Sequence, residues 1–338
     1  MAKAPTVYDV AARAQVSIAT VSRVLRTPNA VTAATSLRVQ AAVKELGYVP
    51  SANARGLAAR RTSVIGLFFP GHDDLEVEPP TSSIEVPIGT EEPIENENLY
   101  FDEVLRGAEV EAWRHGFALM VAAGRGERRD ELLTDLAGRD DGLAILAGAV
   151  ADDVLAQVAR RIPVVVLASA DTDDGYDHVR ANNGPGMRAI TEHVLTKNPE
   201  RVLYIAGPHD SPDDAERFAG FVSAIGGRSF DLARGDFTRA SGRSIPIDHD
   251  AVICANDQMA LGVLDTLERT GRSNVLVTGF DGISAGRHSR PTLTTVHQPM
   301  VELGRAAINA ITRRLEDPTL PPQSHTLPVR VILRQSCP

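Results

Sequence analysis

Beyond residue 62 the chain alternates between short apolar runs and longer segments in which apolar residues recur every three or four positions. A short aliphatic run predicts a buried strand, and the helical spacing predicts a surface helix. Strands are predicted at 64–69, 117–121, 142–146, 163–167, 201–206, 229–232, 251–255 and 274–278, and helices at 99–115, 130–138, 150–161, 186–196, 212–225 and 258–269. This alternation is typical of parallel sheets covered by helices. The pattern occurs twice in succession, so it predicts two doubly wound α/β lobes with a ligand between them, at the carboxyl ends of the strands.

The first fifty residues have a different pattern, three short helical repeats separated by polar residues. Thr6, Ser17 and Thr32 are each suited to cap a helix start, and Gly47 is suited to end the third helix. The three helices are predicted at 7–14, 18–25 and 33–46. The third is expected to contribute these residues to a small core: Leu37, Ala41, Val43 and Leu46. Two short helices joined by a tight turn form an all-α helix-turn-helix, whose second helix can enter the major groove of DNA.

The outward side chains of the second helix are small, hydroxylated or basic: Ile18, Ala19, Thr20, Ser22 and Arg23. Hydroxyl groups can bind phosphates, arginine can read a guanine edge, and small apolar groups can contact a thymine methyl. The alternative is an ordinary helical subdomain on which these side chains are simply exposed.

The overall composition alone argues against nucleic acid, because the 338 residues carry a formal net charge of −9. The charge is unevenly distributed, however. Residues 1–62 hold nine basic and two acidic side chains, a net charge of +7, whereas the rest hold 26 basic and 42 acidic ones, a net charge of −16. Such asymmetry favours a polyanionic partner for the basic part, although charge alone leaves a solvated basic surface open.

Several protein classes do not fit this composition. No apolar run is long enough to span a membrane, and none follows Met1 as a signal peptide would require. Two cysteines, Cys254 and Cys337, do not form a disulfide framework and fit a reducing compartment. We therefore expect a cytoplasmic protein that is not bound to a membrane.

Residues 50–61 form a basic, alanine-rich segment that is too short to be a stable helix on its own. Its one large apolar side chain, Leu57, is flanked by Arg55, Arg60 and Arg61. A leucine in this setting is suited to act as a wedge in the minor groove of DNA, on a segment that folds when it docks. The alternative is a plain basic linker.

Polar side chains follow several of the predicted strands in the acidic part. Asn256 and Asp257 come after one strand, Asp281 comes after another, and Arg217 lies near Phe221 in the helix after a third. Taken singly, these are more simply helix caps and turn residues. Taken together, an arginine, an amide, carboxylates and an aromatic ring favour a site for a sugar or another polyol.

Two groups of motifs resemble the lactose-repressor (LacI) family of transcription regulators. The first comprises Val7-Tyr8-Asp9-Val10-Ala11, the run from Val16 to Leu25, and Leu46-Gly47-Tyr48-Val49-Pro50. The second comprises Ala255-Asn256-Asp257-Gln258-Met259-Ala260-Leu261-Gly262, Gly279-Phe280-Asp281, the run from Arg217 to Phe221, and the run from Pro291 to Pro299. The resemblance spans nearly the whole chain. It implies a DNA-binding headpiece at 1–49, a hinge helix at 50–61, and a two-lobed domain at 62–338 of the periplasmic-binding-protein type, which binds an effector and dimerises.

The resemblance also implies roles for particular residues and segments. Expected DNA-binding positions are Ser17, Ile18, Ala19, Thr20, Ser22, Arg23, Arg26, Thr32, Thr35, Tyr48, Ser51 and Leu57. Expected effector-binding positions are Arg217, Phe221, Phe237, Asn256 and Asp281. The first lobe is expected at about 62–178 and 299–318, and the second at about 179–298 and 319–335.

The implied function is that of a homodimeric regulator, in the main a repressor. It binds near-palindromic double-stranded operator DNA in the nucleoid. A small-molecule effector controls its affinity for the operator, and a sugar is the first candidate for that effector. No cofactor or metal is expected.

The chain departs from the family pattern in places. Residues 72–98 are an insertion with nine acidic residues, four prolines and no Lys or Arg, read as a solvated loop or as a lid over the cleft. Ala168 stands where sugar-responsive members often have an acidic residue, and Gly282 stands where many have a second aspartate. Residues 241–249 replace a longer helix. These differences leave the identity of the effector open.

Three other interpretations remain. A nucleobase- or nucleoside-responsive regulator of the same fold differs only in the contents of the cleft. A periplasmic sugar-binding protein shares the two lobes but not the headpiece. An enzyme on a doubly wound fold would need a phosphate-binding or nucleophile motif, and we find none. His72, Asp73 and Asp74 are more simply part of a solvated loop than a metal site.

Overall fold

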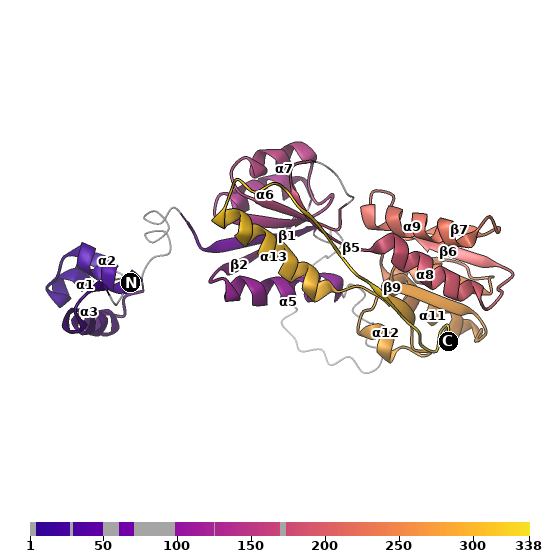
Figure 1. Ribbon diagram of the computed structural model, residues 1–338. Coiled ribbons are helices and arrows are strands. Elements are labelled where there is room, and N and C mark those ends of the chain that lie inside the picture. The colour runs from indigo at the N-terminus through magenta and orange to yellow at the C-terminus, as the bar shows by residue number, and fades with distance from the viewer. Residues whose placement is uncertain (1–4, 28–29, 50–60, 71–98, 125, 170–173) are drawn as a thin grey trace. The chain divides into compact units, whose positions relative to one another are not determined.

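The computed structural model describes residues 5–27, 30–49, 61–70, 99–124, 126–169 and 174–338 (Figure 1). The expected hinge segment up to residue 60 and the acidic insertion at 72–98 lie outside these residues. Contacts divide the chain into two units, residues 1–62 and residues 63–338. Among the described residues, no helix is long and apolar enough to cross a membrane.

The N-terminal unit contains three helices, α1 (Val7–Ala14), α2 (Ile18–Arg26) and α3 (Ala33–Leu46). Each starts at a hydroxylated residue whose side chain accepts a hydrogen bond from a backbone N–H of the first turn. Thr6 forms a capping box with Asp9, because each side chain accepts from the other residue's backbone N–H. Gln15 ends α1 in the left-handed conformation and so turns the chain into α2. The predicted helix-turn-helix is confirmed.

The core of this unit is formed by the apolar faces of the three helices. Its buried members are Val10, Ala11, Ala14, Val21, Val24, Val39 and Ala42. The prediction for the third helix is wrong at two positions, since Leu37 is 66% exposed and Ala41 is exposed as well. At 100° per residue, Val39 lies on the same side of α3 as Val43 and Leu46, whereas Leu37 lies opposite.

The first lobe of the larger unit is built on a sheet whose strands are all parallel, in the order β11-β5-β4-β3-β1-β2. Its strands are β1 (Val64–Pro70), β2 (Ala118–Gly124), β3 (Gly142–Leu146), β4 (Val164–Leu167), β5 (Asp177–Ala181) and β11 (Ser324–Leu327). Its helices are α5 (Leu99–Arg114), η2 (Gly126–Arg128), α6 (Arg129–Ala137), α7 (Asp152–Ala159) and α13 (Met300–Glu316).

The two faces of this sheet are covered by different helices. Ile65 and Leu67 of β1 belong to the cluster that includes the buried side chains of α5 and α13, and Phe68 belongs to the cluster under α6 and α7. This alternation reflects the two-residue period of a strand. Helices α5 and α13 pack closely at Gly107 and Gly304, where an added Cβ atom would meet the backbone of the opposite helix.

The second lobe is built on a sheet with the order β12-β10-β9-β8-β6-β7. Its strands are β6 (Val202–Ala206), β7 (Asp231–Arg234), β8 (Ala251–Cys254), β9 (Leu276–Asp281), β10 (Thr294–His297) and β12 (Arg330–Ile332). Only the pairing of β10 with β12 is antiparallel. Its helices are α8 (Asn183–Leu195), α9 (Pro212–Ile225), α10 (Arg239–Ser244), α11 (Asp257–Thr270) and α12 (Ala285–His288). The predicted fold class, a helix-turn-helix followed in the chain by two doubly wound sheets, is confirmed.

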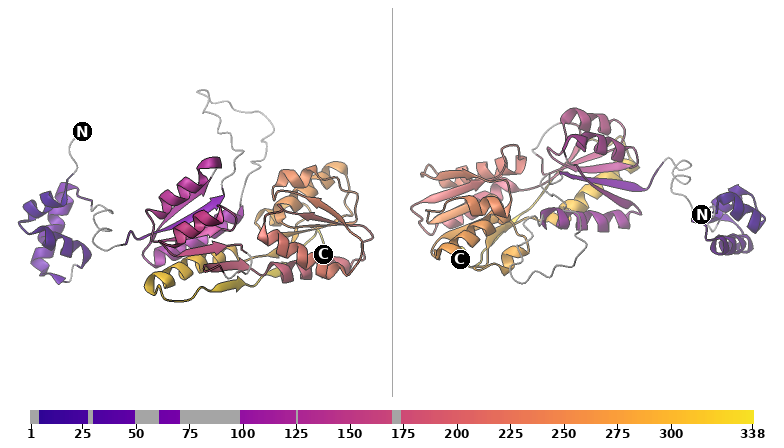
Figure 2. Two further views of the ribbon diagram at one scale, coloured as in Figure 1. Left: turned by 90° about the horizontal axis from the view of Figure 1, so that it is seen from above. Right: turned by 180° about the vertical axis from the view of Figure 1, so that it is seen from behind.

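The chain passes between the two sheets three times, after β5, after β10 and after β11 (Figure 2). The expected boundary at residue 319 is wrong, because β11 extends the first sheet and only β12 lies in the second. The reason is that β11 satisfies the open edge of β5: the backbone N–H of His178 donates to Gln323 and that of Asn182 donates to Leu327. The first crossing also comes slightly later than expected, because β5 continues to Ala181.

Candidate functional site

The outward face of α2 carries the side chains expected to read DNA. Ile18 is 40% exposed, and Ala19 and Arg23 are exposed as well, whereas Val21 and Val24 on the opposite face are buried. Thr20 and Ser22 are half-buried at the edge of this face. The helix therefore presents small, hydroxylated and basic groups together, as the sequence predicted.

The hydroxyl groups expected to contact the DNA backbone lie at helix starts. Ser17 Oγ accepts a hydrogen bond from the Thr20 backbone N–H at 3.2 Å and lies 2.9 Å from the Thr20 hydroxyl. Thr32 and Thr35 form the same arrangement at the start of α3, with 3.0 Å between their hydroxyl oxygens. These side chains thus hold two helix N-termini, whose free N–H groups are suited to phosphate oxygens.

The other polar and basic side chains of the headpiece have different surroundings. Tyr48 is half-buried and packs against the three-helix core. Arg13 pairs with Glu45 at 2.7 Å, whereas none of the described acidic side chains pairs with Arg23. Ser51, Leu57 and the side chain of Arg26 lie outside the described residues.

The larger unit contains a cavity of about 410 Å³ between its two sheets. The first lobe lines it with the residues that follow β1, β3 and β4 and with the start of α5. The second lobe lines it with the residues that follow β6 to β10. The cavity thus lies at the carboxyl ends of both sets of parallel strands, and its volume falls within the usual range for small-molecule sites.

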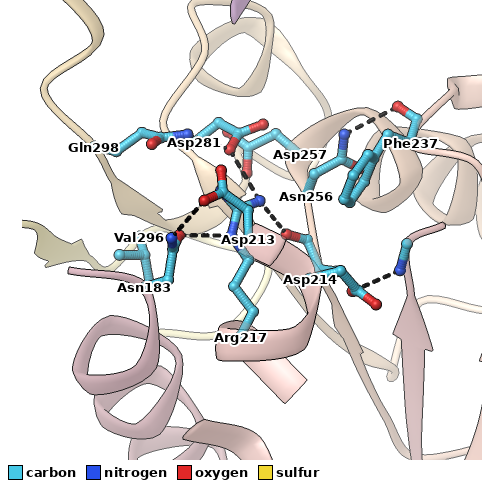
Figure 3. Close-up of polar contacts among 12 residues, drawn as sticks. Asn183, Asp213, Asp214, Arg217, Phe237, Asn256, Asp257, Asp281, Val296 and Gln298 are labelled. Atoms are coloured by element: carbon cyan, nitrogen blue, oxygen red, sulfur yellow. Dashed lines mark hydrogen bonds and ion pairs between the residues drawn. The ribbon is translucent and has the colours of Figure 1, made fainter. Parts of the chain in front are cut away.

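Arg217 lies at the centre of the polar contacts in this cavity (Figure 3). Its Nε donates to Asn183 Oδ1 at 2.9 Å and its Nη1 donates to the backbone oxygen of Ala255 at 2.8 Å. The same guanidinium lies 3.4 Å from a carboxylate oxygen of Asp213 and 3.4 Å from one of Asp281, and it stacks over the Phe280 ring. Arg217 is buried, so every one of its contacts is screened from water.

Asp281 is the last residue of β9 and lines the cavity. Gln298 Nε2 donates to its Oδ1 at 2.7 Å, and Arg217 shares that oxygen. Burial raises the pKa of Asp281 to about 6, even though Arg217 and Gln298 both favour the charged form. Its backbone φ of 119° is unusual for a residue with a side chain. Such strain is commonly found at functional sites.

Asp213 was not among the predicted site residues, yet it lines the cavity. It lies one turn before Arg217 on α9 and accepts from Asn183 Nδ2 at 2.8 Å. Burial raises its pKa, against the influence of Arg217 and Asn183. The signal available in the sequence was the spacing of four residues between an acid and an arginine on one helix.

Asn256 also lines the cavity, but both ends of its amide hold the protein's own backbone. Its Oδ1 accepts from the Met259 N–H at 3.0 Å and so caps α11, and its Nδ2 donates to the Phe237 backbone oxygen at 2.9 Å. Asp257 is fully buried and accepts from the backbone N–H groups of Gly282 and Ile283. Asp257 is therefore a structural residue that shapes the loop after β9.

The two predicted aromatic residues differ in position. Phe237 lines the cavity, with a φ of 69°. The prediction for Phe221 is wrong, because its side chain is fully buried against Tyr204, with 4.5 Å between the ring centroids, and does not line the cavity. Phe221 lies one turn beyond Arg217 on α9, which takes it below the sheet edge and into the core.

Aromatic side chains that the sequence did not single out line the cavity from the first lobe. Tyr100 and Phe101 lie at the start of α5, and the Phe101 ring packs on Phe69 with centroids 4.5 Å apart. Burial, and then the nearby carboxylates of Asp213 and Asp281, raise the pKa of Tyr100. Tyr100 therefore faces the acidic groups of the second lobe. Among the described residues, no cluster of His, Cys, Asp and Glu is suited to a metal ion.

Comparisons with known proteins cover both units. Residues 6–51 match the family of bacterial regulatory proteins named lacI, and residues 191–337 match a periplasmic binding protein-like domain. The ribose operon repressor of Escherichia coli is 30% identical, over 94% of this chain and 95% of the relative.

Solved structures of transcription regulators are also similar to this chain. The complex of the transcriptional regulator CelR with cellobiose is 30% identical, with a TM-score of 0.69 over 98% of this chain and 99% of that one. The lac repressor dimer bound to operator and the anti-inducer ONPF has a TM-score of 0.82 over 99% of each chain, at 23% identity.

Proposed function

Because the chain belongs to the lacI family of bacterial regulatory proteins, and is thus a transcriptional regulator with a ligand-binding domain, we propose that it is a repressor controlled by a sugar. The observation that carries this proposal is the polar cluster around Arg217 in the cavity between the lobes. Carboxylates, an amide and a guanidinium held in fixed positions are suited to the hydroxyl groups of a sugar. Two relatives carry sugars in their names, ribose and cellobiose.

The headpiece is the DNA-binding part in this proposal. Ile18, Ala19 and Arg23 lie on the exposed face of α2 and would contact base edges in the major groove. The hydroxyl groups at the starts of α2 and α3, with Ser22 and Tyr48, would contact phosphates and set the orientation. Arg26 and Ser51 are assigned to the same surface from the sequence.

We assign the chain to a homodimer on a near-palindromic operator, since two copies related by a two-fold axis read two equivalent half-sites. Leu57 would act at the centre of the operator, as a wedge in the minor groove. Leu57→Ala should then weaken specific operator binding much more than nonspecific binding. Equal losses on both DNAs in a titration at fixed salt would contradict the assignment.

The effector and the operator select between the same conformations, so each changes the affinity for the other by the same factor. We propose that the effector lowers operator affinity by changing the relative orientation of the lobes. The test is a thermal-shift panel of sugars, sugar phosphates and nucleosides, repeated with operator DNA present. A ligand that stabilises the free protein and lowers operator affinity supports the proposal. A ligand that raises operator affinity would be a corepressor, and this result would contradict the proposed direction of control.

We also propose that the protein is not an enzyme. One arrangement of residues has the order of a hydrolase triad, since Ser169 Oγ lies 2.5 Å from His178 Nδ1 and Asp174 lies 2.8 Å from His178 Nε2. Ser169 is only 7% exposed, however, and does not line the cavity. These hydrogen bonds tie Ser169 and Asp174 to His178 of β5. Turnover of a bound sugar would contradict this proposal. As a DNA-binding regulator the protein is assigned to the cytoplasm, at the nucleoid.

A further inference from the structure

The two lobes line the cavity with different chemistry. Among the described residues, the first lobe contributes Pro70, Phe101, Leu146 and a set of small residues, and its only polar side-chain atom at the cavity is the hydroxyl of Tyr100. The charged side chains that line the described part of the cavity all belong to the second lobe: Asp210, Asp213, Arg217, Asp236, Arg239 and Asp281. The cavity therefore has an apolar, aromatic wall and a charged wall opposite.

The charged wall has an excess of carboxylates. Four aspartates and two arginines are among the described residues that line it, and each arginine is already paired with carboxylates of the protein. Arg239 makes two hydrogen bonds to Asp265, at 2.8 Å and 2.6 Å, and Arg243 donates to the same carboxylate at 2.7 Å. Arg217 lies between Asp213 and Asp281, and its one positive charge is shared by two carboxylates. An anionic group on a ligand would therefore meet more carboxylates than guanidinium groups among the described lining residues.

The carboxylates of the charged wall differ in the hydrogen bonds that they accept from the protein. Partial burial opposes ionisation of Asp236, but hydrogen bonds from Thr238 and Ser241 outweigh it and lower the pKa. Asp236 is thus charged at neutral pH. Asp281 has one oxygen, Oδ1, held by Gln298 and Arg217, whereas the described residues donate no hydrogen bond to its Oδ2. A hydroxyl group of a ligand can donate to that oxygen, but a carboxylate or a fully ionised phosphate cannot.

From this arrangement we infer that the effector is an uncharged, two-ended molecule, with a hydroxylated end bound by the second lobe and an apolar or aromatic end bound by the first. This inference rests on the proposed function and narrows it. Glycosides with an apolar aglycone and nucleosides share this chemistry, whereas sugar phosphates and nucleotides carry a phosphate that the carboxylates of the charged wall repel. The aromatic end would lie against Phe101, Tyr100 and Leu146, where burial of a ring adds to the affinity of the hydroxylated end.

The test is calorimetric titration of the full-length protein with two matched series. One is glucose, phenyl glucoside and a glucose phosphate; the other is ribose, adenosine and adenosine monophosphate. In at least one series we expect the uncharged conjugate to bind about tenfold or more tightly than its parent sugar. The phosphorylated member should show no binding at millimolar concentration. The series that responds distinguishes glycosides from nucleosides.

A variant separates the two ends of the site. Phe101→Ala should reduce the affinity for the conjugate to that of the parent sugar and leave the parent sugar's affinity unchanged. Leu132→Ala, which removes an exposed apolar side chain from α6 of the same lobe, is the control and should change neither. If Phe101→Ala fails to fold, the inference is still tested by comparing the affinities of the conjugate and the parent sugar for the unaltered protein.

Three outcomes would overturn the inference: a phosphorylated member that binds as tightly as the conjugate, a parent sugar that does so, and no binding by either conjugate. The proposed function is tested separately, by measuring operator affinity with each bound ligand. A conjugate that binds without changing operator affinity contradicts the regulatory role and leaves the inference standing. A sugar phosphate that binds and lowers operator affinity supports the regulatory role and contradicts the inference.

Discussion

Arg180 of the first lobe donates a hydrogen bond to Glu216 of the second, with 2.7 Å between Nη1 and Oε1. Arg180 lies on β5 and Glu216 on α9, so this ion pair bridges the two lobes next to their first crossing. Glu216 precedes Arg217 directly, and Asn183 contacts both residues. The effector site and the link between the lobes therefore share one helix.

Glu216→Gln should weaken the coupling between effector and operator more than it weakens effector binding. The substitution removes the negative charge that pairs with Arg180 and keeps an amide oxygen for Asn183. Coupling free energies in such proteins are about 1–3 kcal/mol, so we expect the effector-induced change in operator affinity to fall several-fold. Fluorescence anisotropy of labelled operator, with and without saturating effector, measures this ratio.

The matched control for that variant is Glu192→Gln, which removes a glutamate paired with Arg188 within α8. Both residues of that pair are exposed and belong to one helix, so the coupling should not change. If Glu216→Gln leaves the ratio of operator affinities at its original value, the ion pair between the lobes does not transmit the effect.

Arg217→Ala should destabilise the larger unit by about 3–5 kcal/mol, because it leaves the buried carboxylates of Asp213 and Asp281 without a cation. Chemical unfolding monitored by circular dichroism measures the loss. Arg188→Ala, which breaks an exposed pair on α8, should cost less than about 1 kcal/mol. Similar losses for both variants would show that the polar cluster has no net role in stability.

Much of the fold follows from local patterns in the sequence. Buried strands such as β6 are continuous aliphatic runs, and caps such as Thr6 and Ser17 mark helix starts directly. Strands β5, β10, β11 and β12 were not predicted from this pattern, in part because residues such as Asp177, His178 and Thr294 are polar. Their burial depends on partners far away in the chain: Asp177, for example, is held by Arg313 and Arg314 of α13. No local pattern contains that information.

The site was predicted in part for the same reason. Asp281 ends a strand, Asn256 follows one, and Arg217 lies in the helix after a third, so the topology brings them to one edge. Which of two phenylalanines faces the cavity depends on packing: Phe221 fills the space beside Tyr204, whereas Phe237 is held over the cavity by the contact between its backbone oxygen and Asn256. The aromatic wall from α5 was missed because Tyr100 and Phe101 have the spacing of ordinary core residues.

Arg23→Ala should reduce specific operator binding by about 1–3 kcal/mol and relax the preference at one base pair of each half-site. Arg23 is exposed on α2, where a side chain can reach base edges. Arg13→Ala is the control, because Arg13 is already paired with Glu45. Binding to operator and to unrelated DNA at the same salt concentration separates base recognition from phosphate contact. Equal losses on both would assign Arg23 to the backbone.

Asp140 should make the stability of the larger unit depend on pH in the direction opposite to that of a salt-bridged aspartate. Its side chain is 3% exposed, and neither carboxylate oxygen has a hydrogen-bond partner among the described residues. Burial, and then the charge of Asp141, raise the pKa of Asp140 to about 6. The folded protein therefore binds a proton more tightly than the unfolded chain, in which an aspartate has a pKa of about 3.9.

The sign follows from that difference. Above about pH 6 the folded state holds an unpaired buried charge, and stability is lowered by about 2–3 kcal/mol. As the pH falls from about 6 towards 4 the carboxyl group is protonated in the folded state first, and the penalty disappears. Asp140→Asn removes this titration, so it should be more stable than the unaltered protein at pH 7 and should lose that advantage near pH 4.

Urea unfolding at a series of pH values measures the effect as the difference between the two proteins, which cancels the titration of all other groups. Asp135→Asn is the matched control, because it makes the same change at an exposed position of α6, the helix that precedes Asp140. Its difference from the unaltered protein should be small and nearly independent of pH. If the curve for Asp140→Asn runs parallel to that of the unaltered protein, Asp140 has a hydrogen-bonded or hydrated environment in solution and contributes no pH dependence to stability.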